Sequence, residues 1–290
     1  MKKEIFRGVG TALVTPFLGG AIDYGALEVL IERQVASGIE AIVIGGTTGE
    51  AATLSDPERY ELFRAARDIV AGRTSLIFGT GTNDTALAKK HTEMAEKIGC
   101  DGVLVVTPYY NKGTREGVIK HYENISKCTN LPIILYNVPS RTGVDLPTES
   151  VARLAEYENI VAIKEASSKP GRLAELSRTR GIRLYAGNDA DTLTTLRLGG
   201  SGVISVVSNL YPAIMHELTE SYFRGNEERA IELERKLAPA IEAMFYETNP
   251  APIKFVLSHL GLCSGELRLP MWPVDESTAS KILQKIDGIC

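Results

Sequence analysis

Lys164 is the residue of this sequence with the clearest potential for chemistry. It closes an apolar run, Ile160–Ile163, whose β-branched and small residues predict a buried strand. A lysine at the end of such a strand keeps its stem in hydrocarbon and holds its amine at the strand's carboxyl end. Burial disfavours the ammonium form, so the amine becomes nucleophilic and can form a Schiff base with a ketone. A lysine that merely caps a strand is the plainer alternative, and the neighbouring residues decide between the two.

Two further reactive side chains fall one strand earlier. Tyr136 precedes Lys164 by 28 residues, the length of one strand–helix unit, so we expect the two to project from neighbouring strands. A phenol beside a Schiff-base lysine can carry protons to and from the carbinolamine. Arg141 follows in the predicted loop after Tyr136, and its guanidinium fits a substrate carboxylate in two-point contact. A structural salt bridge is the alternative role for this arginine.

A glycine-rich segment, Gly45–Glu50, follows another predicted strand. Its glycines allow close approach of the backbone, and its N–H groups together with the hydroxyls of Thr47 and Thr48 can cradle a small carboxylate. An ordinary strand-to-helix loop explains the glycines equally well. Tyr109 and Tyr110 lie side by side on a later loop, so at most one of them can face a site within its own chain. Aromatic packing at a rim or interface is the alternative for each.

The elements that must position these residues recur with a regular period. Longer stretches with helical spacing separate short apolar runs, and Asp23, Ser55 and Asp84 are predicted to cap three of the helices. The chain has eight such strand–helix units, the number found in a (β/α)₈ barrel. A doubly wound α/β sheet gives the same alternation, but the count of eight favours the barrel. The eight runs are Gly8–Val14, Glu40–Ile44, Ser75–Gly79, Gly102–Thr107, Ile133–Asn137, Ile160–Lys164, Arg183–Gly187 and Gly202–Val206.

The pattern becomes purely helical toward the end of the chain. We therefore predict a barrel over residues 1–225, with the active site at the carboxyl ends of its strands, and a helical extension over residues 226–290. The extension is expected to contain helices at Glu227–Phe245, Pro252–Leu260 and Asp275–Ile286.

Composition and spacing argue against several other classes of protein. With 32 basic and 36 acidic side chains in 290 residues, the net charge of −4 gives no footprint for nucleic acid or an anionic membrane. No apolar stretch approaches the roughly 18 residues of a membrane span, so we expect a cytoplasmic protein. The four cysteines and four histidines show no metal-binding spacing, and we expect no metal site.

Several motifs together resemble the dihydrodipicolinate synthase family, one of the pyruvate-dependent class I aldolases. The resemblance covers essentially the whole chain and is carried by Gly45–Glu50, Tyr136–Gly143, Ile163–Glu165 and Asn249–Lys254. It implies condensation of pyruvate with L-aspartate 4-semialdehyde, the first committed step of lysine and diaminopimelate biosynthesis. It also implies a homotetramer built as a dimer of dimers, with no cofactor beyond the Schiff base formed by pyruvate.

The resemblance also implies roles for individual residues. Lys164 would form the Schiff base, and Tyr136 would donate and accept protons, linked through Thr48 to Tyr110 of a neighbouring subunit. Thr47 and Thr48 would bind the pyruvate carboxylate, and Arg141 would bind the carboxylate of the semialdehyde. Backbone groups near Gly187 and Ile204 would complete the site.

Lysine-sensitive members of the family bind the inhibitor in a crevice beside the residue that matches Tyr109. In this sequence Asn83 matches the pattern of that crevice, but Leu87 stands where sensitive relatives have an acidic residue. The other positions that depart from the pattern are Ala51, Asp56 and Arg59. The resemblance therefore implies weak lysine inhibition or none.

Two alternatives remain open at this point. The same lysine, tyrosine and Gly-Thr-Gly-Glu frame serves N-acetylneuraminate lyases and 2-keto-3-deoxy sugar-acid aldolases, which typically lack an arginine at the position of Arg141. A non-catalytic barrel that binds pyruvate or an amino acid is the alternative from another class. Such a barrel would be expected to lack the lysine, the tyrosine or a relay residue, and all of these are present.

Overall fold

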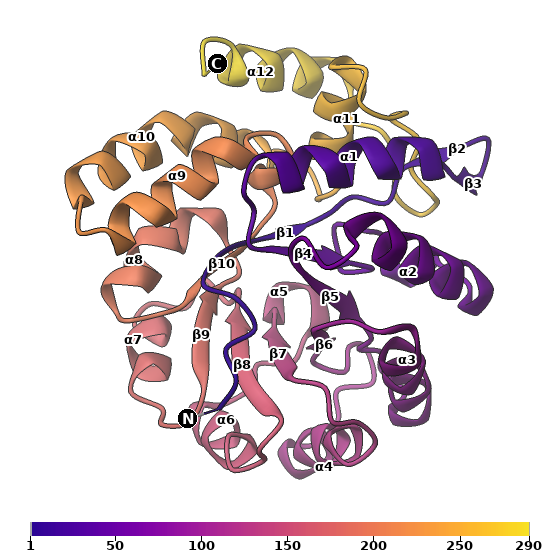
Figure 1. Ribbon diagram of the computed structural model, residues 1–290, viewed down its shortest axis with the longest axis vertical. Coiled ribbons are helices and arrows are strands. Elements are labelled where there is room, and N and C mark those ends of the chain that lie inside the picture. Colours follow the sequence, from indigo (N-terminus) through magenta and orange to yellow (C-terminus); the bar gives the residue numbers. More distant parts are fainter. Residues whose placement is uncertain (1, 290) are drawn as a thin grey trace. The chain divides into compact units, whose positions relative to one another are not determined.

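Eight strands form one closed barrel in a computed structural model that describes residues 2–289 (Figure 1). Their order around the barrel is β1-β10-β9-β8-β7-β6-β5-β4. The barrel prediction is confirmed, and each predicted strand is present with its ends shifted by at most two residues. The strands are β1 Gly8–Ala12, β4 Ala41–Ile44, β5 Ser75–Gly79, β6 Gly102–Val106, β7 Ile133–Asn137, β8 Ile160–Glu165, β9 Arg183–Ala186 and β10 Gly202–Ser205.

Helices follow the strands in alternation, and the predicted caps are present. The Asp23 side chain accepts from the N–H of Ala26, and Ser55 and Glu58 form a reciprocal capping box. The helices are α1 Tyr24–Ala36, α2 Asp56–Val70, α3 Thr85–Ile98, α4 Arg115–Ser126, α5 Pro139–Thr142, α6 Thr148–Leu154, α7 Arg172–Ser177, α8 Thr192–Arg197, α9 Pro212–Phe223, α10 Glu227–Ala243, α11 Ala251–His259 and α12 Glu276–Ile286, with short 3₁₀ turns η1 Ala51–Thr53, η2 Asp189–Asp191 and η3 Val207–Asn209.

Two features were not expected from the pattern. A small hairpin, β2 Phe17–Leu18 and β3 Ala21–Ile22, precedes α1, and strands of two residues are too short to show a period. The segment after β7, predicted as a loop, forms the single helical turn α5. Pro139 opens this turn, and Gly143 closes it with φ +69°, the left-handed conformation that favours glycine.

The chain forms two compact units. Unit 1 joins the residues up to Arg7 to Ser75–Ile204, and unit 2 joins Gly8–Thr74 to the residues from Ser205 onward. Unit 1 thus holds β5 to β9 with α3 to α8, whereas unit 2 holds β1, β4, α1, α2 and α9 to α12. The predicted division into residues 1–225 and 226–290 follows the change in element type and stays a prediction.

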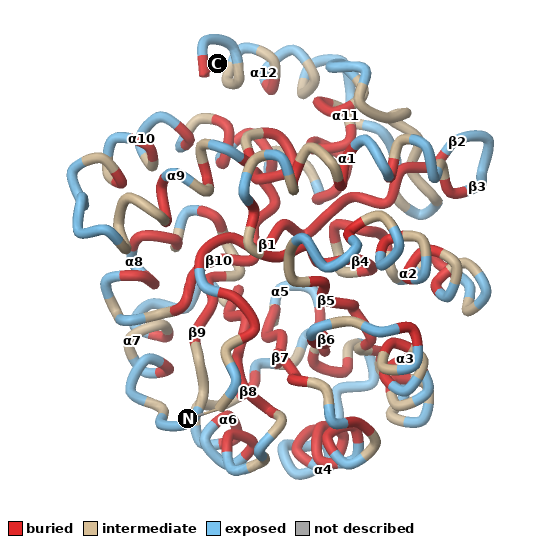
Figure 2. The backbone as a smooth tube through the Cα atoms, viewed as in Figure 1, coloured by how far each residue is buried: buried red, intermediate tan, exposed pale blue. Residues whose placement is uncertain are grey.

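Within each unit the strands are the most buried elements, whereas the helices alternate between buried and exposed turns (Figure 2). All six residues of β8 are buried, as expected of a barrel strand covered on both faces. Strand β8 pairs in parallel with β7 and β9, which fixes the register of its side chains against those of its neighbours. In residues 2–289, no helix has both the length and the apolar character of a membrane span.

Candidate active site

Lys164 and Tyr136 form the centre of the candidate site in unit 1. They are register partners on β8 and β7, as the spacing of 28 residues predicts. Lys164 is 5% exposed and Tyr136 is 6% exposed. The amine Nζ of Lys164 lies 4.4 Å from the centroid of the tyrosine ring, within the range of a cation–π contact. The structure therefore holds a lysine amine against a phenol ring near the carboxyl ends of two barrel strands.

Asn137 and Glu165, the next residues on the two strands, point to the opposite face. There they belong to a cluster of polar side chains that holds the two strand ends together. Asn137 Nδ2 donates to both carboxylate oxygens of Glu165, at 3.1 Å each. Arg172 Nε lies 3.2 Å from Glu165 Oε2, and both side chains are almost fully buried. The N–H of Ser167 also donates to Glu165 Oε1, at 2.7 Å. Because its carboxylate is fully engaged there, we assign Glu165 to positioning the end of β8 and not to proton transfer.

Arg141 lies on the exposed side of the turn α5, directly after β7. Its backbone N–H donates to the carbonyl of Val138, and the next residue, Thr142, is buried. The turn thus ties Arg141 to the strand that carries Tyr136. Arg141 is thus an exposed residue one short turn away from that strand.

Tyr110 is the more exposed of the two adjacent tyrosines, at 87%. Its backbone has φ +72°, a left-handed conformation that is strained for a residue with a side chain. Its N–H donates to the carbonyl of Thr142 at 3.3 Å, which ties this loop to the turn α5. Tyr109 is only half-buried. The loop therefore directs one large aromatic side chain into solvent at a cost in backbone strain.

Gly187 and Ile204 lie at the ends of β9 and β10. A Cβ on Gly187 would come within 2.6 Å of the Ala166 Cβ, so only glycine fits beside β8 at this point. The N–H of Gly187 donates to the carbonyl of Glu165 at 2.7 Å, which ties the end of β9 to the end of β8. Ile204 is fully buried in β10.

Thr47 and Thr48 belong to unit 2, in the glycine-rich loop between β4 and η1. Thr47 is partly exposed, whereas Thr48 is 2% exposed. Within the loop, Glu50 N–H donates to the carbonyl of Thr47. Thr15 Oγ1, from the segment after β1, donates to the carbonyl of Gly49 and holds the loop from outside. The side chain of Asn249, from the segment before α11, donates to the Thr48 hydroxyl at 2.9 Å.

A buried ion pair anchors the same loop, and the sequence pattern did not predict it. Lys254 on α11 is fully buried, and its Nζ lies 2.5 Å from Glu50 Oε1 and 2.9 Å from the carbonyl of Glu266. The other oxygen of Glu50 accepts from the N–H of Arg268 at 3.0 Å. Burial lowers the pKa of Lys254, and the Glu50 carboxylate opposes that shift. The sequence gives no local signal for this pair, because its two members lie in segments far apart along the chain.

The residues expected at an inhibitor crevice are divided between the two units. In unit 1, Asn83 and Leu87 are half-buried near the start of α3, and the Asn83 carbonyl accepts from Asn111 Nδ2 at 2.9 Å. In unit 2, Arg59 is buried and donates to the carbonyl of Ala51 at 2.8 Å. Asp56 is half-buried at the first turn of α2.

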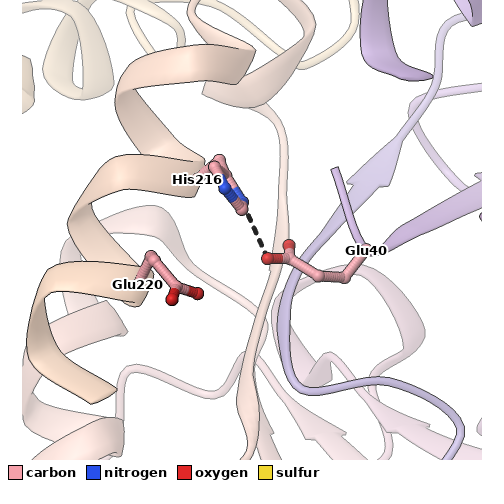
Figure 3. A group of neighbouring side chains, drawn as sticks. All are labelled: Glu40, His216 and Glu220. Atoms are coloured by element: carbon pink, nitrogen blue, oxygen red, sulfur yellow. Dashed lines mark hydrogen bonds and ion pairs between the residues drawn. The ribbon is translucent and has the colours of Figure 1, made fainter. Parts of the chain in front are cut away.

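One group of side chains in unit 2 has the composition of a metal site (Figure 3). The ligand atoms of Glu40, His216 and Glu220 lie within 4.8 Å of one another. Each has a partner in the protein: Glu40 pairs with His216 Nδ1 at 2.8 Å and accepts from the N–H of Val9, and Glu220 accepts from Arg224. Burial raises the pKa of Glu40, and the Val9 N–H and His216 oppose the shift. These contacts account for the group, and we assign no metal to it.

A closed (β/α)₈ barrel that carries a buried lysine–tyrosine pair on neighbouring strands has the architecture of the aldolase-type lyases. Comparison with known proteins narrows this class. The profile of the dihydrodipicolinate synthetase family matches residues 5–288. A 4-hydroxy-tetrahydrodipicolinate synthase of Thermotoga neapolitana is 47% identical over 94% of this chain and 95% of its own length.

Solved structures agree with that assignment. A dihydrodipicolinate synthase from Thermotoga maritima superposes with a TM-score of 0.96 at 44% identity, covering 99% of each chain. A monomeric dihydrodipicolinate synthase variant superposes with a TM-score of 0.94 at 44% identity, covering 97% of each chain. The chain belongs to the dihydrodipicolinate synthetase family.

Proposed function

We propose that this protein is a 4-hydroxy-tetrahydrodipicolinate synthase, which condenses pyruvate with L-aspartate 4-semialdehyde through a Schiff base on Lys164. The observation that carries the proposal is the buried Lys164 amine held against the Tyr136 ring. The family and the names of its relatives support the choice of reaction. The lysine is itself the covalent catalyst, so the proposed chemistry needs no other cofactor.

The proposed reaction begins when the Lys164 amine attacks the pyruvate ketone and forms a carbinolamine. Loss of water gives an imine, and loss of a methyl proton then gives an enamine. Tyr136 is proposed to move these protons, since its ring already contacts the lysine amine. The enamine carbon attacks the aldehyde, and cyclisation by the substrate's own amine releases the lysine.

The other polar groups are proposed to bind the two carboxylates. Thr47 and Thr48 hold that of pyruvate, and Arg141, exposed on the turn α5, holds that of the semialdehyde. The carbonyl of Gly187 and the backbone at Ile204 are proposed to complete the binding site.

A substrate panel tests the proposed reaction. The purified protein is given pyruvate with L-aspartate 4-semialdehyde and, separately, N-acetylneuraminate or 2-keto-3-deoxygluconate. We expect turnover only with the first pair. Faster cleavage of either sugar acid would assign the site to an aldolase of the alternative group, and no turnover with any substrate would favour a binding module.

We further propose that the enzyme is a homotetramer, a dimer of dimers in which Tyr110 serves the site of a neighbouring subunit and takes part in proton transfer there with Thr48. The exposure of this tyrosine on a strained backbone supports the proposal, since strain of this kind concentrates at functional sites. A related variant is described as monomeric, so assembly needs its own test.

Tyr110→Phe is expected to slow turnover about a hundredfold or more without changing assembly, because one proton-transfer group is lost. Sedimentation velocity and steady-state kinetics measure the two effects. Tyr60→Phe, an exposed tyrosine on α2, is the matched control and should turn over normally. A monomer with full activity in dilute solution would contradict the shared site.

Inhibition by lysine is expected to be weak or absent. Lysine brings two ammonium groups, which are costly to desolvate without anionic partners. Leu87 offers no charge, and the buried cation of Arg59 is already bound to the carbonyl of Ala51. Loss of one charge-assisted contact lowers affinity by about ten- to a hundredfold. Turnover at saturating substrates across a lysine titration tests this, and half-inhibition below about 1 mM would contradict it.

A further inference from the structure

Asn249 makes a buried hydrogen bond to one of the threonines proposed to bind pyruvate. Its Nδ2 lies 2.9 Å from Thr48 Oγ1, and the amide is the donor. Asn249 is 5% exposed and Thr48 is 2% exposed. A hydrogen bond removed from water in this way is electrostatically stronger than one at the surface.

A second contact holds Asn249 in place relative to the loop. Lys254, on the first turns of the helix α11 that follows Asn249, pairs with Glu50, two residues after Thr48. The two contacts therefore join the same two segments at neighbouring points. This double attachment restricts how far the loop that carries Thr48 can shift against Asn249.

The direction of the Asn249 bond sets the direction of the Thr48 hydroxyl. A threonine hydroxyl has a single hydrogen and can also accept. Because its oxygen receives the amide hydrogen of Asn249, its own hydrogen is directed to a different partner. A carboxylate offers only acceptors, so a hydroxyl that binds one must donate.

We infer that Asn249 is a positioning residue that orients the Thr48 hydroxyl as a hydrogen-bond donor for the pyruvate carboxylate. The inference rests on the proposed function, since it assumes that pyruvate is the ligand of Thr48. Asn249 does not touch the substrate in this account. It acts through Thr48, and its contribution depends on the amide being a donor.

Two substitutions separate this role from simple packing. Asn249→Asp keeps the size and shape of the side chain but replaces the donor by an acceptor, which draws the Thr48 hydrogen toward residue 249. Asn249→Ala removes the amide and leaves the hydroxyl free to turn. We expect kcat/KM for pyruvate to fall about tenfold in the alanine variant and about a hundredfold in the aspartate variant.

The KM for L-aspartate 4-semialdehyde is expected to stay within about twofold in both variants. If the substitutions merely loosened the loop, the binding of both substrates would become weaker. Alanine, the larger structural change, would then be the more damaging substitution. Equal activity of wild type and Asn249→Asp, or a greater loss with alanine than with aspartate, would overturn the inference.

A double-mutant cycle with Thr48→Val completes the test, because valine keeps the shape of threonine and lacks its hydroxyl. In that background, Asn249→Ala should cause no further loss in kcat/KM for pyruvate. A full additional loss would show that Asn249 acts independently of the hydroxyl. This cycle decides the matter even if Asn249→Asp does not fold, which thermal unfolding of each variant reports.

The failure of this inference can be told apart from the failure of the proposed function. If the wild-type protein does not react with pyruvate, both the proposed function and the role of Asn249 are wrong. If the wild-type protein condenses pyruvate, the proposed function stands. If the variants then show neither a larger loss with aspartate than with alanine nor coupling to Thr48, only the role of Asn249 is wrong.

Discussion

Lys164→Ala is expected to lower turnover by at least about a thousandfold and to abolish the covalent adduct with pyruvate. The variant lacks the amine that forms the Schiff base, and no other group in the proposed mechanism can replace it. We expect the barrel to fold, since the substitution removes a buried amine and introduces no larger side chain. Steady-state kinetics and borohydride trapping measure the two losses.

A matched control is available on the surface of the protein. Lys281 lies exposed on α12, and Lys281→Ala should retain turnover and the adduct. If Lys164→Ala kept a substantial share of wild-type turnover while folding normally, the assignment of the nucleophile would be wrong.

Arg141→Ala is expected to leave formation of the pyruvate adduct unchanged and to slow condensation with the semialdehyde. Loss of a bidentate, charge-assisted contact with the semialdehyde carboxylate should cost about 2–4 kcal/mol in the transition state, or about thirty- to a thousandfold in kcat/KM. Pyruvate should still form its adduct, because Arg141 has no part in the proposed steps at Lys164. Condensation assays and trapping of the pyruvate adduct measure the two steps separately.

Arg141→Lys provides the matched comparison, since it keeps the charge but loses the planar fork. Its condensation activity should lie between those of wild type and Arg141→Ala. Unaltered kinetics for the semialdehyde in Arg141→Ala, or failure of that variant to form the pyruvate adduct, would contradict the role assigned to this residue.

The sequence predicted the parts of this site that depend on local period. Tyr136 and Lys164 could be placed on neighbouring strands because one strand–helix unit separates them, and the register confirms it. The barrel strands themselves are short runs of apolar residues with clear boundaries, so they could be located to within two residues. The hairpin β2–β3 and the turn α5 are too short for such a signal.

The contacts that hold the glycine-rich loop could not be predicted in the same way. Thr48 and Glu50 meet Asn249 and Lys254 across about two hundred residues of chain. Nothing in the local spacing of either segment specifies the other, because tertiary packing alone brings them together. The apolar pattern predicts a helix that includes Lys254, and the family resemblance covers Asn249, but only the structure shows that this segment is attached to the loop.

The most direct test of the central claim is to trap the Schiff base on the wild-type protein. The protein is incubated with pyruvate, reduced with borohydride and digested, and its peptides are analysed by mass spectrometry. We predict one pyruvate-derived mass per chain, located on Lys164, and none when pyruvate is omitted. An adduct on another lysine, or no adduct under conditions in which the protein turns over, would contradict the account.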